Sequence, residues 1–198
     1  MMIFGRGILT GLFAILLASS GEASAAGQLD CMAQSYDAGQ LAKIAEASEG
    51  FTINKSRDDK SQGFADIAIM AAANCADQRS WTDDQIYHAM FYEIGRLGEA
   101  AYRHSGNLTA EQMVKLDRAL TNQDRTELWA LMEKTVAASI NGEEANLSLK
   151  DQTKLGIFII GSGLGSDEAT GEKVGGLLGM MAIQRYAQRE FEALEKKE

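Results

Sequence analysis

The sequence predicts an all-α fold, and two of its features support that prediction. The 198-residue chain contains no proline, which is the residue least compatible with helix interiors. Its apolar residues recur at spacings of three and four, the period of one helix face. No Gly-, Ser- or Pro-rich linker divides the chain, and no internal repeat has a fixed period. We therefore expect a single-domain bundle of about six to seven helices.

Residues 1–25 have the order of a secretory signal. Arg6 comes first, a short apolar run from Ile8 to Ala18 follows, and Ala23-Ser24-Ala25 has the A-x-A form of a cleavage site. The apolar run is shorter than the about 20 residues that a membrane-spanning helix requires. We expect cleavage after Ala25 and an exported protein, periplasmic or secreted, whose single domain spans residues 26–198.

Three helices are expected in the first half of the chain, at residues 28–48, 62–77 and 83–104. Gly50 ends the first of them, because glycine commonly follows the last residue of a helix. The polar connection TINKSRDDKSQ then leads to the second helix. The third carries the longest apolar stripe, which consists of Tyr87, Met90, Phe91, Ile94, Leu97 and Ala101.

Four further helices are expected at residues 110–120, 122–140, 149–164 and 171–196. Thr109 and Gln112 begin the first of these with a capping box, in which each side chain satisfies a backbone amide of the other residue. Thr121 and Ser148 give similar start signals. Asn141-Gly142 is typical of a helix end. The helix before it repeats the apolar spacing with Trp129, Met132, Val136 and Ile140.

Cys31 and Cys75 are the two cysteines of the chain. An even number of cysteines in an exported protein indicates a disulfide. A bridge between them would close a loop of about 45 residues and contribute about 4 kcal/mol in the chain-entropy model. Cys75 shares a helical stripe with Phe64 and Ala71, so the bridge would tie the start of the exported chain to a buried face. A redox-active thiol pair is the alternative, which the absence of Cys-x-x-Cys spacing disfavours.

The segment LGIFIIGSGLGSDEATGEKVGGLLGMMAI, residues 155–183, has two apolar runs around a polar middle. Gly161 and Gly165 are four residues apart, as are Gly175 and Gly179. In an antiparallel pair of helices these glycines would face each other, and the missing Cβ atoms would permit close backbone approach. We therefore predict a C-terminal glycine-rich antiparallel helical hairpin within the core. Membrane insertion of this hairpin, or self-association through it, is the alternative.

Charge and motif spacing exclude several classes of function. The formal net charge is −9 at pH 7, and an acidic surface repels phosphate groups, so we expect no nucleic-acid partner. The spacing around Gly171 does not match a phosphate-binding loop, and Ser162 lacks the G-x-S-x-G pattern of a nucleophile elbow. No cluster has the spacing of zinc ligands, so we expect no metal and no cofactor.

Asp84, His88 and Glu93 form the candidate polar site. Asp84 and His88 are four residues apart and share one face of the predicted helix. A surface ion pair is the simpler interpretation of that spacing. An enzyme of unrecognised type centred on these three residues remains one alternative function, without an assigned catalytic residue.

Trp81, Tyr92, Arg96 and Tyr102 belong to a region rich in aromatic residues. They are expected in the core or, if exposed on a concave surface, in contact with a protein or peptide partner. We therefore expect an exported, non-catalytic helical module that binds a protein, a peptide or a small ligand.

A small, exported, helical domain with Cys31 and Cys75 about 44 residues apart resembles the acid-stress chaperones of the bacterial periplasm. That resemblance implies a test, holdase activity toward an aggregating client at strongly acidic pH. We expect this chain to lack that activity, and no residue role is carried over.

Overall fold

The computed structural model describes residues 25–52, 59–121, 124–144 and 146–196. These residues form nine helices, and no strand occurs among them. The predicted all-α fold class is therefore confirmed. The predicted secretory signal lies outside the described residues, except for Ala25, with which the first helix begins.

The helices range from a single turn to the long C-terminal element. Their bounds are α1 Ala25–Leu29, α2 Cys31–Gln34, α3 Ala38–Ser48, α4 Asp59–Arg79, α5 Asp83–His104, α6 Ala110–Thr121, α7 Thr126–Ile140, α8 Leu149–Gly161 and α9 Glu168–Glu195. The predicted helices at residues 83–104 and 110–120 agree with α5 and α6 to within one residue, and the capping box of Thr109 and Gln112 is present.

The single helix predicted at residues 28–48 is wrong, because the structure divides it into α1, α2 and α3. Asp37 has an extended backbone, with φ −80° and ψ 171°. Its carboxylate accepts a hydrogen bond from the Gln40 amide, and the Gln40 side chain accepts one from the Asp37 amide. This capping box starts a new helix where a continuous helix was expected.

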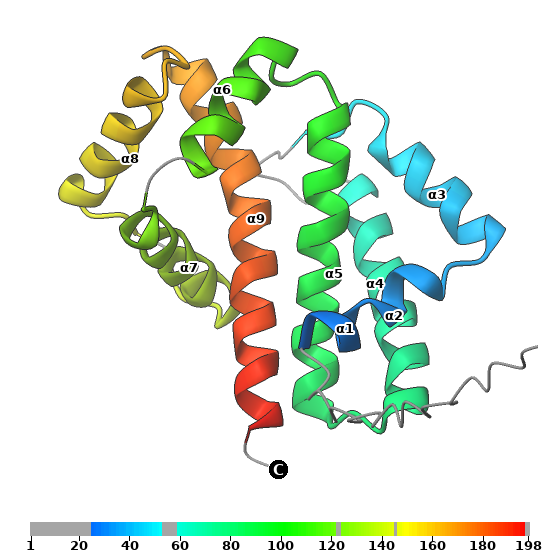
Figure 1. The fold of residues 1–198 in the computed structure, drawn as a ribbon. Coiled ribbons are helices and arrows are strands. Elements are labelled where there is room, and N and C mark those ends of the chain that lie inside the picture. The colour runs from blue at the N-terminus through cyan, green and yellow to red at the C-terminus, as the bar shows by residue number, and fades with distance from the viewer. Residues whose placement is uncertain (1–24, 53–58, 122–123, 145, 197–198) are drawn as a thin grey trace, which may run out of the picture.

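The pair α5 and α9 forms the centre of the molecule, with α3 and α4 on one side and α7 and α8 on the other (Figure 1). Gly95 makes the close contact between the central helices, since a Cβ atom there would lie 2.7 Å from the Gln184 amide nitrogen and 2.9 Å from the Met180 carbonyl oxygen. Two neighbouring hydrophobic clusters run along this pair.

The glycines predicted to form a packed seam do not make close contacts. A Cβ atom at Gly161, Gly175 or Gly179 would meet no other group within 4 Å. Gly165 lies in the connection between α8 and α9 with φ +112°. Glycine adopts this backbone conformation more readily than other residues do, which accounts for its presence there. The expected close approach is wrong because α9 packs mainly against α5, with α8 diverging from it (Figure 1).

None of the helices in the described ranges combines the length and the apolar character needed to cross a bilayer.

Candidate functional site

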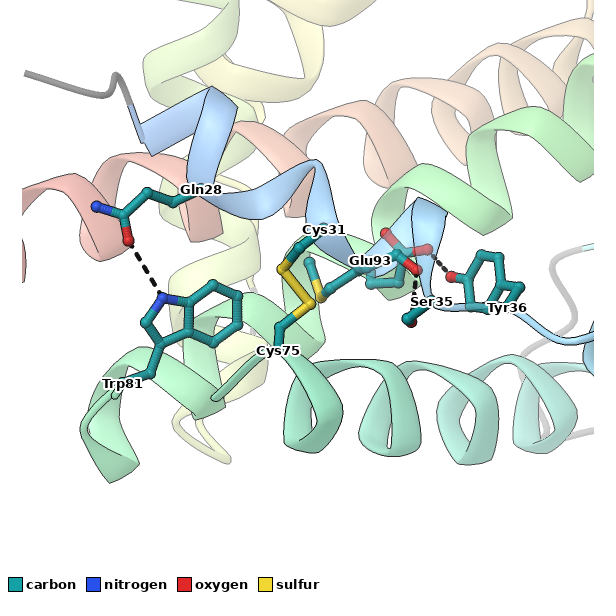
Figure 2. Close-up of a disulfide and its surroundings, with 8 residues drawn as sticks. Gln28, Cys31, Ser35, Tyr36, Cys75, Trp81 and Glu93 are labelled. Atoms are coloured by element: carbon teal, nitrogen blue, oxygen red, sulfur yellow. Dashed lines mark hydrogen bonds between the residues drawn. A yellow bond between two sulfur atoms is a disulfide. The ribbon is translucent and has the colours of Figure 1, made fainter. Parts of the chain in front are cut away.

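The predicted disulfide is present and joins α2 to α4. The Cα atoms of Cys31 and Cys75 are 6.0 Å apart, and both side chains are buried. Beside it, the indole Nε1 of Trp81 donates to the Gln28 side-chain oxygen over 3.2 Å (Figure 2). The Trp81 ring packs edge-on against Phe191 of α9. The N-terminal helices are therefore fastened to both α4 and α9.

Glu93 is fully buried and has partners on both oxygens. Arg96 donates from Nε to Oε2 over 2.8 Å and from Nη2 to Oε1 over 2.5 Å. The Tyr36 hydroxyl donates to Oε1 (Figure 2). The hydrogen bond with Glu93 raises the pKa of Arg96 above its ordinary value. The hydrogen bonds of Glu93 therefore hold the connection between α2 and α3, which contains Tyr36, against α5.

His88 lies on another side of α5, toward α9. Its ring is 6.3 Å from the Tyr186 ring, between centroids. Burial lowers the pKa of His88, and the charges of Glu190 and Asp84 oppose that shift. The Nδ1 atom is buried and has no hydrogen-bond partner among the described residues.

The structure therefore does not assemble Asp84, His88 and Glu93 into one site. His88 and Glu93 are five positions apart on α5, which rotates them away from each other by about 140° around the helix axis. Glu93 is committed to Arg96 and Tyr36, while Asp84 is exposed. Over the described ranges, no group of three or more His, Cys, Asp or Glu side chains could hold a metal ion.

The expected partner surface is largely interior. Trp81, Tyr92 and Tyr102 are buried, and Arg96 alone of the four is partly exposed. Tyr102 packs edge-on against Phe51, and burial raises the pKa of its hydroxyl. These three aromatic rings pack in the core and are not available as a contact surface for a partner.

A pocket of about 680 Å³ lies between α7, α9 and the end of α6. Its wall contains three arginines and three acidic residues beside an apolar part. The charged residues are Arg125, Arg185, Arg189, Asp124, Glu133 and Glu192, and the apolar ones are Leu120, Trp129 and Ala130. Sequence reasoning did not identify this pocket.

Glu133 organises the pocket wall. Its side chain is only 9 % exposed and pairs with both Arg185 and Arg189. Arg185 Nε donates to Oε1 over 3.3 Å, and Arg189 Nη1 donates to Oε2. The two arginines are four residues apart and therefore share one face of α9. A carboxylate on α7 thus holds both of them against the pocket.

Aromatic rings support each guanidinium. Arg185 lies 4.6 Å above the Trp129 ring centroid, and Arg189 lies 5.3 Å from that of Tyr186. Arg125 lies 5.0 Å from the Phe158 centroid. Stacking of this kind restricts the side chains while leaving N–H groups at the guanidinium edge.

No protein-family model matches the chain, and neither a curated protein nor a solved structure was found to be similar to it.

Asp124 and Glu192 of the pocket each accept hydrogen bonds from a neighbouring residue. Asp124 accepts from the amide and the hydroxyl of Thr126, and these hydrogen bonds lower its pKa. Glu192 accepts from Gln188. The pocket therefore presents fixed charges suited to holding a ligand.

The sequence contains part of the pattern that marks this pocket. Trp129 and Glu133 are four residues apart, and so are Arg185 and Arg189, so each pair occupies one helix face. Nothing in either spacing indicates that the two faces meet, because that depends on how α7 packs against α9.

Proposed function

We propose that the protein is an exported, non-catalytic helical binding module whose ligand occupies the pocket between α7 and α9. The observation that carries the proposal is the pair Arg185 and Arg189, held at the pocket wall by buried Glu133. Side chains fixed before a ligand arrives lose less conformational entropy on binding.

Export is supported by the predicted signal at residues 1–25 and by the disulfide between Cys31 and Cys75. Disulfides persist in oxidising compartments and are rare in the cytosol. A periplasmic or secreted location is therefore part of this proposal.

Binding is favoured over catalysis by the state of the polar groups. Both oxygens of Glu133, the buried carboxylate of the pocket, pair with arginine, so this group is not free to act as a general base toward a substrate. The Thr126 hydroxyl donates to Asp124, and the lowered pKa of that carboxyl group makes it a weak base for activating a nucleophile.

A thermal-shift panel of small neutral, cationic and anionic compounds tests the proposal. A ligand at about 100 times its Kd stabilises by about 2.7 kcal/mol, which corresponds to a rise of about 5–10 °C for a protein of this size. We expect one class to raise the melting temperature and Ala130→Trp, which fills the pocket from an exposed position, to abolish the rise.

Ser139→Trp is the matched control, because Ser139 is exposed on α7 and does not line the pocket. It should leave the ligand effect unchanged. A panel without any stabilising compound, or stabilisation that persists in Ala130→Trp, contradicts the proposed site.

A second candidate function is membrane contact or self-association through α8. Its Leu149, Ile157 and Ile160 are 80 %, 65 % and 59 % exposed. Co-sedimentation with liposomes at neutral and acidic pH tests membrane contact, and sedimentation velocity tests self-association. Loss of liposome binding or of self-association in Ile157→Ser/Ile160→Ser would support this function. A wild-type protein that is monomeric and does not bind liposomes would exclude it.

A further inference from the structure

We propose that the ligand of the α7–α9 pocket is a small organic carboxylate, recognised by Arg185 together with Arg125. This inference rests on the proposed binding function and adds the chemistry of the ligand. It follows from which N–H groups of the pocket arginines are already used and which are not.

Arg185 is anchored at one nitrogen and open at the other two. Its Nε donates to Glu133, and its face covers Trp129. Nη1 and Nη2 have no hydrogen-bond partner among the described residues, and the side chain is 50 % exposed. The free edge of the guanidinium therefore offers two parallel N–H groups, which is the geometry that a carboxylate accepts.

Arg125 repeats this arrangement from the start of α7. Its Nε donates to the Ala119 carbonyl oxygen over 2.7 Å, and its face lies against Phe158. Its Nη atoms also have no hydrogen-bond partner within the described ranges. Arg189 differs, because Glu133 and Glu190 take its N–H groups. Two of the three pocket arginines thus keep open edges.

The charge of the wall favours a singly charged group. Asp124, Glu133 and Glu192 balance the three arginines, so a doubly charged phosphate would leave more uncompensated negative charge in the pocket than a carboxylate does. Trp129, Leu120 and Ala130 provide an apolar wall for the organic part of the ligand. The combination fits a carboxylate joined to an apolar or aromatic body.

Benzoate, benzamide and phenylphosphonate are the probes for this proposal. The chain has two tryptophans, so Trp81→Phe leaves Trp129 as the reporter in the pocket. We expect a saturable change in Trp129 emission with benzoate and at least about tenfold weaker binding of uncharged benzamide, because hydrogen bonds to charged groups are the stronger ones. Phenylphosphonate should bind more weakly than benzoate. Isothermal titration of the unsubstituted protein measures the same constants without a tryptophan replacement.

Arg185→Gln and Arg185→Lys identify the recognising group. Arg185→Gln should weaken benzoate binding by about tenfold or more. Arg185→Lys keeps a charge beside Glu133 but lacks the planar fork, so it should recover only part of the affinity. Arg118→Gln, at an exposed position on α6 outside the pocket, should leave the affinity unchanged. If Arg185→Gln does not fold, the benzoate affinity of Arg185→Lys serves as the test, and it should be lower than that of the unsubstituted protein.

Equal affinity for benzoate and benzamide overturns the proposal, and so does unchanged benzoate affinity in the Arg185 variants. Tighter binding of phenylphosphonate than of benzoate assigns the arginines to phosphoryl groups instead. A neutral or cationic compound that binds in an Ala130→Trp-sensitive manner, without benzoate binding, refutes the carboxylate and leaves the binding module intact. Absence of binding by every probe and panel compound contradicts both the carboxylate inference and the proposed binding module.

Discussion

Two buried carboxylates, Glu93 and Glu133, have similar partners and different surroundings. Glu93 is sealed beneath Arg96 and Tyr36, whereas the arginines that hold Glu133 are half exposed at a pocket. The first arrangement fastens two segments of chain together. The second leaves the Nη edge of Arg185 available to a ligand, which is why the proposed function is assigned to Glu133 and its arginines.

Glu93→Ala should lower the free energy of unfolding by about 3 kcal/mol, because removing one partner of a buried ion pair strands the other. Tyr36→Phe removes one hydrogen bond and should cost about 1 kcal/mol. Urea denaturation of both variants measures these differences. A Glu93→Ala variant as stable as the wild type would mean that the buried pair makes no net contribution.

His88 should make the stability depend on pH. Burial lowers the pKa of His88 below its ordinary value of 6.5, so the unfolded chain binds the proton more readily than the folded protein does. Stability is therefore greatest above pH 6.5 and falls as the pH drops through 6.5 toward the folded pKa. His88→Phe should reduce that slope in denaturation measurements at several pH values. His104→Gln, at an exposed position, should leave it unchanged.

At the scale of elements, two helical glycines differ in what surrounds them. Gly95→Ala places a Cβ against the α9 backbone and should destabilise by about 1–3 kcal/mol, the usual cost of overpacking. Gly175→Ala meets open space and should stabilise by up to about 1 kcal/mol through helix propensity. Melting temperatures of the two variants test this contrast, and the reverse order would restore the glycine seam expected from the sequence.

The disulfide should matter most for α1 and α2, which are helices of only five and four residues. Cys31→Ser/Cys75→Ser should lower the free energy of unfolding by about 4 kcal/mol in the chain-entropy model. Hydrogen exchange should show the largest loss of protection in α1 and α2. Unchanged protection there would show that the Trp81–Gln28 contact suffices to hold them.

Local sequence determined much of the helix content and little of the packing. Periodicity predicted α5 to the residue, and a capping box predicted the start of α6, because both depend on near neighbours. The break at Asp37 was missed, although its capping box with Gln40 is visible in the sequence. The glycine seam and the α7–α9 pocket depend on which helix packs against which, and periodicity carries no information about partners.

At the scale of the whole molecule, charge is unevenly distributed. The chain has a net charge of −9, while the three arginines of the pocket wall are balanced by three acidic residues, so the pocket is neutral on an acidic molecule. An anionic ligand is therefore attracted by the nearby guanidinium groups, within about one Debye length, and not by the protein surface as a whole. Benzoate binding should weaken as the salt concentration rises, and titrations at two ionic strengths check this.

Export can be tested with the predicted signal alone. Residues 1–25 fused to a phosphatase that is active only after export should give activity in cells, and Leu16→Asp, which interrupts the apolar run, should abolish it. Equal activity in both fusions would argue against a secretory signal.

The close contact of Gly95 with Met180 and Gln184 also affects when this protein folds. The central pair joins a helix from the middle of the chain to the last one, so its native core cannot close until α9 has left the ribosome. Contacts between residues so distant in sequence form slowly. If the chain is exported as proposed, its core stays incomplete until synthesis ends, which suits transfer across a membrane before folding.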